Sequence, residues 1–394
     1  MSVSTALALA HDITYLTFTY KEVDNTCLLL DVYLPGHHGQ LRPAQRSHIS
    51  CPVVVYFHGG GLTVGNKRSW FPRWLHRRMT RAGCAFISVE YRLIPPSTGH
   101  DVLADVKDAM HFISHKLNSL LLHNHDSDDA EATLPAFTVD SGRVAVVGTS
   151  SGGLCAFFAA IHATPRPKAV LSMYGMGGNM LTPHYFMPKK EIFFRGRELL
   201  EPVRFSEYLY PASQQLSTTA DSPLAYHPSG SPTPGYPANP RMQLARLYFQ
   251  LGVYLDYYTG YHEPSLSAAI REAYGHSSDL EPESGNSRVD QLRSLVPAES
   301  LHLFPQFCVS EPMSESLRWP ATLLVHGTAD TAICADESRN LYTLLRHAGV
   351  DVALRLVQGQ EHSFDYVKNA EEIFGGEGGL FGEAAAFLIR HLEA

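Results

Sequence analysis

The sequence lacks the features that define several classes of protein. Lysine and arginine (31 residues) are fewer than aspartate and glutamate (39 residues), so the formal net charge is −8. This balance argues against a nucleic-acid partner. No apolar run is long enough to cross a membrane, so no membrane span is expected. Residues Met1 to Ala10 carry a short apolar patch without a basic stretch, which predicts no signal peptide.

Metal-binding and glycosylation patterns are missing as well. The 21 histidines form no H-E-x-x-H motif, and the six cysteines form no C-x-x-C pair, so no metal site is expected. No N-x-[S/T] sequon occurs, which agrees with an intracellular protein. The scattered cysteines suit free core thiols in a reducing compartment, and we expect a cytoplasmic location. These cysteines are Cys27, Cys51, Cys84, Cys155, Cys308 and Cys334.

An alternation of strands and helices dominates the rest of the chain. Hydrophobic residues make up 44% and charged residues 18%, enough to build a large core. Strands are expected at residues 13–20, 28–34, 53–57, 85–89, 144–147, 169–173, 321–325 and 352–357, most of them short apolar runs. Helices are expected at 70–82, 101–122, 154–160, 336–348 and 379–392. The alternation predicts an α/β fold, a mostly parallel eight-stranded sheet with helices on both faces.

The alternation stops between residues 175 and 319. Eleven of the 19 tyrosines lie in this stretch. Residues 222–240 are rich in proline and glycine and predict an irregular loop, whereas residues 242–258 carry a helical apolar stripe. Because strands and helices resume afterwards, we interpret 175–319 as a lid inserted into one fold, with the core formed by 1–174 and 320–394. The alternative is a separate domain of unrelated function.

A pentapeptide of the form G-x-S-x-G follows a buried apolar run. It is Gly148-Thr149-Ser150-Ser151-Gly152, and an alanine-rich helical stretch comes after it. Strand, sharp turn and helix form the context in which this motif places a nucleophilic serine at the apex of the turn. The two glycines allow the strand and the helix to approach closely. The alternative is an ordinary glycine-serine turn.

A glycine-rich loop follows the expected strand at 53–57. Its residues are His58, Gly59, Gly60 and Gly61. Consecutive glycines allow the backbone to turn and to present bare N–H groups, as in an oxyanion hole supplied by the loop after the third strand. The alternative is a flexible loop. His58 is interpreted as a structural residue that holds this loop.

Two further side chains follow expected parallel strands. Asp330 comes after the strand at 321–325, and His362 comes after the strand at 352–357. The carboxyl ends of parallel strands meet at one edge of the sheet, where ligands bind. Asp336 is the rival acid and is interpreted as a cap of the following helix. Glu361, beside the histidine, is expected to be solvated.

The order Ser150, Asp330, His362 and the His-Gly-Gly-Gly loop resemble the α/β-hydrolase superfamily, above all its hormone-sensitive-lipase-like carboxylesterases. The segment Tyr91-Arg92-Leu93 is similar to one in that branch. Two segments depart from it. The serine motif reads Gly-Thr-Ser-Ser-Gly where the branch usually has Gly-Asp-Ser-Ala-Gly. The segment 326–330 resembles peptidase-like hydrolases instead.

The resemblance implies a serine hydrolase with Ser150, His362 and Asp330 as its catalytic triad. Backbone N–H groups of Gly60, Gly61 and Ser151 would form the oxyanion hole, and no cofactor is needed. The aromatic and apolar lid favours a carboxylic ester of a fairly apolar small molecule as substrate. Amide, lactone or thioester hydrolysis, or acyl transfer or cyclisation in a natural-product pathway, remain open, as does a homodimer. A non-catalytic small-molecule receptor on the same fold is the alternative from another class.

Overall fold

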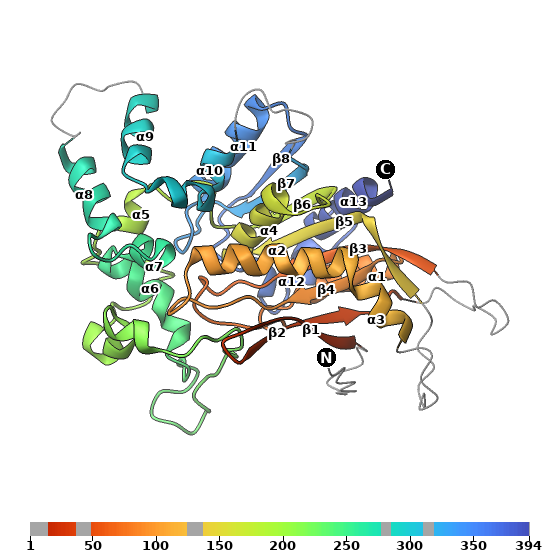
Figure 1. Ribbon diagram of the computed structural model, residues 1–394, viewed down its shortest axis with the longest axis horizontal. Helices are drawn as coiled ribbons and strands as arrows, with labels where there is room; N and C mark the ends of the chain where they lie inside the picture. The colour runs from red at the N-terminus through yellow and green to blue at the C-terminus, as the bar shows by residue number, and fades with distance from the viewer. Residues whose placement is uncertain (1–14, 37–48, 124–136, 277–284, 310–318, 394) are drawn as a thin grey trace.

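The computed structural model describes residues 15–36, 49–123, 137–276, 285–309 and 319–393. Its centre is a single eight-stranded sheet in the order β1-β2-β4-β3-β5-β6-β7-β8 (Figure 1). The strands are β1 (Tyr15–Val23), β2 (Thr26–Tyr33), β3 (Ile49–Phe57), β4 (Ala85–Val89), β5 (Phe137–Thr149), β6 (Ala169–Met173), β7 (Ala321–Gly327) and β8 (Val352–Val357). Strands β1 and β2 pair antiparallel with each other, and β2 pairs antiparallel with β4; all other pairs are parallel. The predicted α/β fold with a mostly parallel sheet is therefore confirmed.

Burial of the strands follows their place in the sheet. Every residue of the central strands β4 and β6 is buried, as their continuous apolar sequences predict. The antiparallel strand β1 alternates buried and half-buried residues, because one of its faces is open to solvent. The first two residues of its predicted range, 13 and 14, and residues 1–10 lie outside the described part of the chain.

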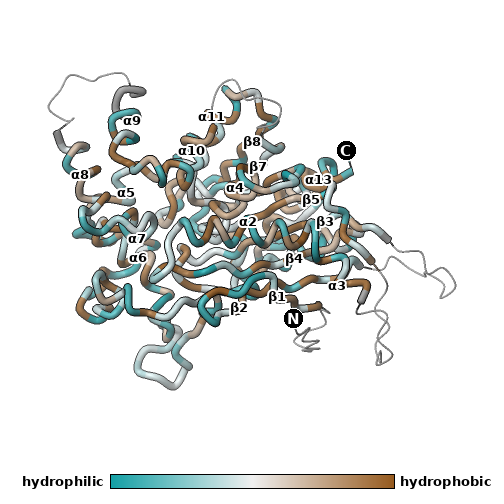
Figure 2. The backbone as a smooth tube through the Cα atoms, viewed as in Figure 1, coloured by the Kyte–Doolittle hydropathy of each residue, from teal (hydrophilic) through white to brown (hydrophobic). Residues whose placement is uncertain are grey.

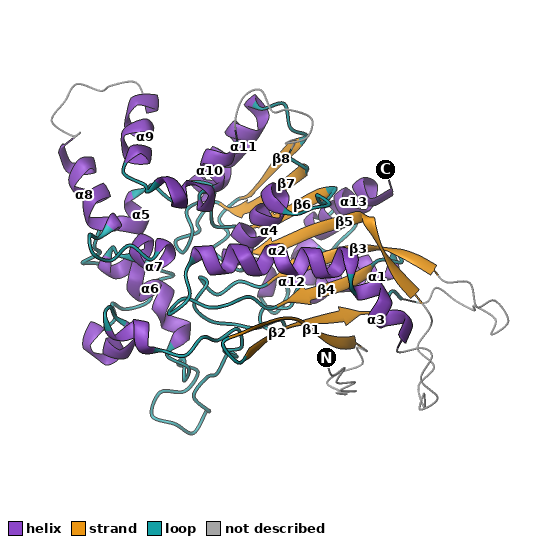
Figure 3. Ribbon diagram, viewed as in Figure 1, coloured by secondary structure: helices purple, strands orange, loops and turns teal. Residues whose placement is uncertain are grey.

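Helices cover both faces of the sheet (Figure 3). One face carries α2 (Gly99–His115), α3 (Leu117–His123), α4 (Ser151–His162) and α11 (Ala335–His347), and the other carries α1 (Arg73–Arg81), α12 (Ala370–Phe374) and α13 (Leu380–Glu393). Strand β3 divides its side chains between the two cores: Val53 and Val55 pack on one, Val54 and Tyr56 on the other. Along α2, hydrophobic residues recur at the three- and four-residue spacing of one helix face, with hydrophilic residues between them, as expected of a helix with one buried face (Figure 2).

Three predicted helices differ from the observed ones. The helix at 70–82 begins only at Arg73, since Trp70 has a positive φ of 47° and Pro72 precedes the first turn. The helix at 101–122 is divided into α2 and α3 at Lys116. The helix within 242–258 is divided by Gly252, whose φ of 66° ends α6.

The segment between β6 and β7 forms a helical layer of its own. It contains α5 (Pro183–Phe186), α6 (Arg241–Leu251), α7 (Tyr254–Thr259), α8 (Leu266–His276), α9 (Gly285–Ser294) and α10 (Pro305–Cys308). Figure 1 shows α5 to α9 gathered at one end of the sheet. We refer to residues 175–319 as the inserted segment. Its division from the core at residues 174 and 319, and its action as a lid, stay predictions.

No disulfide links the six cysteines, all of which lie within the described residues. Cys51, Cys84 and Cys155 are buried, whereas Cys27 is exposed although it lies in β2. Among the described residues, no helix combines the length and the apolar composition that a bilayer span requires. The described residues also contain no cluster of histidine, cysteine and acidic side chains that could hold a metal ion.

A buried carboxylate joins α11 to the start of the inserted segment. Glu337 is 2% exposed, and its Oε2 accepts hydrogen bonds from the backbone N–H groups of Gly177 (2.8 Å) and Gly178 (3.1 Å). Its Oε1 accepts a hydrogen bond from the hydroxyl of Tyr185. Burial raises the pKa of Glu337 to about 7, although these donors favour the ionised form.

This raised pKa predicts a pH dependence of stability. The folded chain holds the Glu337 proton more tightly than the unfolded chain, so the contribution of this group falls as pH rises from its ordinary pKa of 4.5 to about 7. Glu337→Gln should flatten the decline in melting temperature over that range. The control Asp336→Asn, at a carboxylate whose side chain is 74% exposed, should leave the slope unchanged. Equal slopes for wild type and Glu337→Gln would contradict the prediction.

Candidate active site

Ser150 lies on a sharp turn between β5 and α4. Its backbone has φ 55° and ψ −125°, a strained combination for a residue with a side chain. A Cβ atom on Gly148 would lie 1.9 Å from the carbonyl oxygen of Gly152, and one on Gly152 would lie 2.1 Å from the carbonyl oxygen of Phe57. Only glycine fits at both positions, and the turn therefore presents the Ser150 hydroxyl into a pocket.

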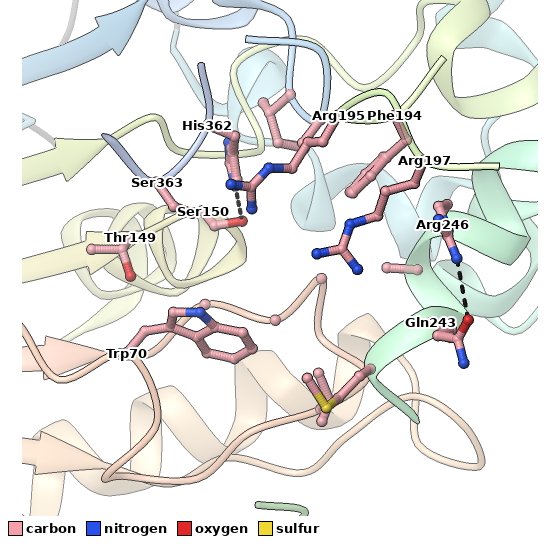
Figure 4. Close-up of a pocket in the computed structure, with 18 of the residues that line it drawn as sticks. Trp70, Thr149, Ser150, Phe194, Arg195, Arg197, Gln243, Arg246, His362 and Ser363 are labelled. Carbon is pink, nitrogen blue, oxygen red and sulfur yellow. Dashed lines mark hydrogen bonds between the residues drawn. The ribbon is translucent and has the colours of Figure 1, made fainter. Parts of the chain in front are cut away.

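The structure brings the three predicted side chains together. The Ser150 Oγ lies 2.9 Å from His362 Nε2, and His362 Nδ1 lies 2.6 Å from Asp330 Oδ2 (Figure 4 shows the first contact). His362 follows β8, Asp330 follows β7 and Ser150 follows β5, so the ends of three parallel strands position them. A serine hydroxyl, an imidazole and a carboxylate in this order can transfer a proton and attack an acyl carbon.

Asp330 is held in its ionised form. Burial raises its pKa, but the charges of His362 and His326 and the hydrogen bonds from both rings outweigh burial, so the pKa falls below its ordinary value. Its Oδ1 also accepts hydrogen bonds from the backbone N–H groups of Ala332 and Ile333, each 2.9 Å long. A carboxylate with these partners stays charged at neutral pH and can orient the imidazole.

His326 is a member of the site to which sequence analysis assigned no role. It is fully buried, and its Nε2 lies 3.2 Å from Asp330 Oδ2 and 2.9 Å from the carbonyl oxygen of Ile333. Since both neighbours of Nε2 are acceptors, this nitrogen carries the proton, and Nδ1 accepts from the hydroxyl of Ser338 at 2.7 Å. In the sequence, the spacing of four residues between His326 and Asp330 could have indicated this contact.

Glu361 connects the two loops that carry Asp330 and His362. It is partly exposed, as the expectation of solvation implies, but its carboxylate also accepts three hydrogen bonds. The donors are the backbone N–H of Thr331 (2.8 Å), the Thr331 hydroxyl (2.6 Å) and the backbone N–H of His362 (2.7 Å). Glu361 is therefore a positioning residue for both loops.

The rival acid Asp336 lies apart from this network. It sits in the first turn of α11 and accepts a hydrogen bond from Arg339 at 2.7 Å. The residue at the cap position is Cys334, and no side chain caps the helix there. The interpretation of Asp336 as the cap was therefore wrong, although its negative charge suits the positive end of the helix dipole.

The glycine loop has the backbone conformation that its sequence predicts. Gly60 and Gly61 have φ values of 114° and 65°, and both line the pocket beside Ser150. A Cβ atom on Gly60 would lie 2.1 Å from the carbonyl oxygen of Val64, and one on Gly61 would lie 2.3 Å from Cβ of Ala245 in α6. Side chains are therefore excluded at both positions, and the backbone itself lines the pocket.

His58 anchors this loop, in agreement with its structural interpretation. The ring is fully buried, and burial lowers its pKa to about 4, so it is neutral. Nδ1 donates a hydrogen bond to the carbonyl oxygen of Gly59 at 2.7 Å. The ring also stacks on Tyr91 with a centroid distance of 4.4 Å, and the Tyr91 hydroxyl donates to the His58 carbonyl oxygen at 2.7 Å.

Ser151 is the first residue of α4, directly after Ser150. It is fully buried, and its backbone N–H belongs to the free amino end of the helix, where the dipole favours negative charge. The N–H groups of Gly60, Gly61 and Ser151 thus lie on two segments that flank Ser150.

A cavity of about 150 Å³ opens in front of Ser150. Trp70, Thr149, Tyr174 and Tyr366 line it from the sheet side, and Phe194, Met242, Ala245 and Phe249 line it from the inserted segment. The inserted segment also contributes Arg195, Arg197 and Arg246 (Figure 4). Sequence analysis expected an apolar pocket and named none of the arginines, although a glycine between two arginines at 195–197 indicated a turn.

Comparison with protein families agrees with this fold. A family described as alpha/beta hydrolase fold matches residues 54–235, and the Carboxylesterase family matches residues 8–95. The Prolyl oligopeptidase family matches residues 287–375, which include the segment 326–330 that resembles peptidase-like hydrolases. These matches and the eight-stranded sheet identify the α/β-hydrolase fold.

Individual proteins are similar to this chain over different shares of its length. The non-reducing polyketide synthase trt4 of Aspergillus terreus is 26% identical over 90% of this chain, and the probable carboxylesterase M8 of Phoma sp. is 30% identical over 40% of it. The chain covers 13% of the length of that synthase and 46% of the length of that carboxylesterase. Among solved structures, the esterase LipW from Mycobacterium marinum matches with a TM-score of 0.52 and 16% identity, over 97% of this chain and 83% of its own.

The contacts of Glu361 predict that this residue affects turnover. Glu361→Ala removes the shared acceptor of the two loops and should lower kcat for an ester roughly tenfold, since small misplacements of catalytic groups are costly. Glu361→Gln keeps one acceptor oxygen and should recover part of the loss. The exposed Glu372→Ala is the matched control and should leave kcat unchanged. Wild-type turnover in Glu361→Ala would show that the loops hold without it.

Proposed function

We propose that this chain is a serine esterase with Ser150, His362 and Asp330 as its catalytic triad. The observation that supports this most directly is the pair of contacts at His362, 2.9 Å from Ser150 Oγ and 2.6 Å from Asp330 Oδ2, at a strained serine turn. Asp330 accepts the Nδ1 proton of His362, so Nε2 is free to accept a proton from Ser150.

In the proposed reaction, His362 Nε2 takes the proton of Ser150 as Oγ forms a bond to the ester carbonyl carbon. The carbonyl electron pair moves to its oxygen, and the N–H groups of Gly60, Gly61 and Ser151 stabilise this oxyanion; one such donor is typically worth ~3 kcal/mol. Collapse of the intermediate breaks the bond to the leaving alcohol, which receives the proton from Nε2. Water then attacks the acyl-enzyme in the same way and releases the acid.

The proposed substrate is a small carboxylic ester with apolar parts. The aromatic and apolar walls of the pocket, among them Trp70, Phe194 and Phe249, support this choice. The inserted segment supplies one side of the pocket and would act as its lid. The six free thiols support a reducing compartment, and we propose the cytoplasm.

A second candidate keeps the triad and changes the bond to a thioester in the synthesis of a natural product. It rests on the relatives named as polyketide synthases, which are 24–26% identical over 89–95% of this chain. The same attack by Ser150 would expel a thiol instead of an alcohol.

Labelling with a fluorophosphonate tests the proposed nucleophile. The probe should form one adduct at Ser150, located by mass spectrometry, because only a serine activated by a base reacts rapidly. Ser150→Ala should be unlabelled, and His362→Ala should lose at least about 10⁴-fold in kcat. Ser119→Ala, on the exposed side of α3, should label as wild type. A folded wild-type protein without an adduct would contradict the proposal.

A matched pair of substrates separates the two candidates. 2-Acetamidoethyl butyrate and S-butyryl-N-acetylcysteamine differ only in the oxygen or sulfur atom of the leaving group. As an esterase, the protein should cleave the oxygen ester at least as fast as the thioester, measured as kcat/KM and lost in Ser150→Ala. A preference for the thioester of about 100-fold, more than a single binding contact supplies, would favour the second candidate.

A further inference from the structure

A tight hairpin in the inserted segment presents two arginines to the pocket. Phe194 and Arg197 pair across it, and the N–H of Arg197 donates to the carbonyl oxygen of Phe194 at 2.9 Å. The central residues Arg195 and Gly196 have φ values of 51° and 64°, as in a type I′ turn. Asparagine, aspartate or glycine usually occupies the first of these positions, so an arginine there adds backbone strain.

The hairpin is attached to the loops of the proposed triad. The backbone N–H of Arg195 donates to the Thr331 hydroxyl at 2.8 Å, and that hydroxyl donates to Glu361, which also binds the N–H of His362. Figure 4 shows the side chains of Arg195 and Arg197 extending toward the pocket that Ser150 and His362 also line. The strained turn is therefore held at the place where its arginines face the nucleophile.

Arg246, in α6, lines the same pocket and is only 6% exposed. Its Nη2 donates to Gln243 Oε1 at 3.1 Å, and the same oxygen accepts a hydrogen bond from the Tyr236 hydroxyl at 2.8 Å. Burial lowers the pKa of Arg246 and the positive charge of Arg197 lowers it further, whereas Tyr236 and the negative charge of Glu198 raise it. Both hydrogen-bonding neighbours are neutral, and the carboxylate of Glu198, an exposed residue, forms no ion pair with Arg246 among the described residues.

Other buried arginines of the chain are partnered more fully. Arg92 forms ion pairs with Asp101 and Asp105, and Arg241 donates to three backbone carbonyl oxygens. Within the described ranges, no ion pair to a carboxylate involves Arg195, Arg197 or Arg246. Arg195 and Arg197 are exposed, and water compensates their charges in part. Arg246 is buried and has no ion-pair partner among the described residues, so its charge favours an anion in the pocket.

We propose that the pocket selects substrates that carry an anionic oxygen group, a carboxylate or a phosphate, bound by Arg197 and Arg246 while the acyl carbonyl lies at Ser150. This inference rests on the proposed function and narrows its substrate class. Guanidinium groups bind carboxylates and phosphates through paired, charge-assisted hydrogen bonds. The apolar residues Phe194, Met242 and Phe249 would hold the uncharged part of the substrate.

Two matched pairs of substrates test the charge preference and locate the anion. The 1-naphthyl monoester of adipic acid differs from 1-naphthyl hexanoate by a carboxylate on the acyl group. S-Hexanoyl-4′-phosphopantetheine differs from S-hexanoylpantetheine by a phosphate on the leaving group. We expect the charged member of one pair to have at least about a tenfold higher kcat/KM, the size of one good charge-assisted contact. The pair that shows the preference identifies the anion's source; a preference in neither pair overturns the proposal.

Arginine variants show whether the preference comes from these side chains. Arg246→Gln and Arg197→Gln should each remove most of it by raising KM much more for the charged substrate than for the neutral one. Arg246→Lys keeps the charge and should restore part of it. The matched control is Arg204→Gln, at an exposed arginine of the inserted segment paired with Glu201, and it should keep the preference. Equal losses for charged and neutral substrates would indicate a structural role and overturn the proposal. Should Arg246→Gln not fold, the exposed Arg197→Gln carries the same test.

A binding measurement separates failure of this inference from failure of the proposed function. Ser150→Ala, which cannot turn over, is titrated with adipate and with 4′-phosphopantetheine by calorimetry, alone and combined with Arg246→Gln. Binding of one anion that weakens at least about tenfold in the double variant supports the anion site. If neither anion binds while wild type still cleaves neutral esters, the anion site is overturned and the esterase stands. If an anion binds but Ser150 takes no fluorophosphonate, the esterase fails and the anion site stands.

Discussion

The close approach of three backbone segments around Ser150 is the constraint on which the site depends. The end of β5, the start of α4 and the end of β3 approach so closely that Gly148 and Gly152 leave no room for a Cβ atom. This packing holds Ser150 at a positive φ that an isolated turn would not keep. The buried apolar residues of β3, β5 and α4 supply the free energy that maintains it. The strain of the serine is thus supported by the core of the whole sheet.

The part of the site that contains Asp330 and His362 is held by hydrogen bonds instead of close packing. Asp330 and His362 lie on loops after neighbouring strands, and Glu361 and His326 fix those loops from two sides. The inserted segment joins this network through Thr331, which accepts the N–H of Arg195. Pocket walls, Ser150 and His362 are therefore parts of one connected structure, although they come from segments far apart in sequence.

Sequence predicted the parts of this structure that short segments determine. The buried strands, the glycine-flanked serine and the residues just after β7 and β8 all carry their signal within a few neighbouring positions, and the structure contains each of them. The reversed direction of β2 relative to β4 and the division of α2 from α3 depend on distant packing. The positions of the arginines that line the pocket also depend on distant packing. Arg246 reads as one polar residue of a helix, and only the folded chain places it near Arg197, about fifty positions away.

The contact between Gly61 and Ala245 couples the size of the pocket to the position of the glycine loop. The glycine loop and helix α6 meet there with no room for a side chain on Gly61. Helix α6 also carries Met242, Arg246 and Phe249, which line the pocket. A shift of this helix therefore changes the size of the pocket and the aim of the loop's N–H groups in the same movement. In the proposed esterase, widening the pocket through α6 therefore also moves Gly61, so substrate range and rate change together.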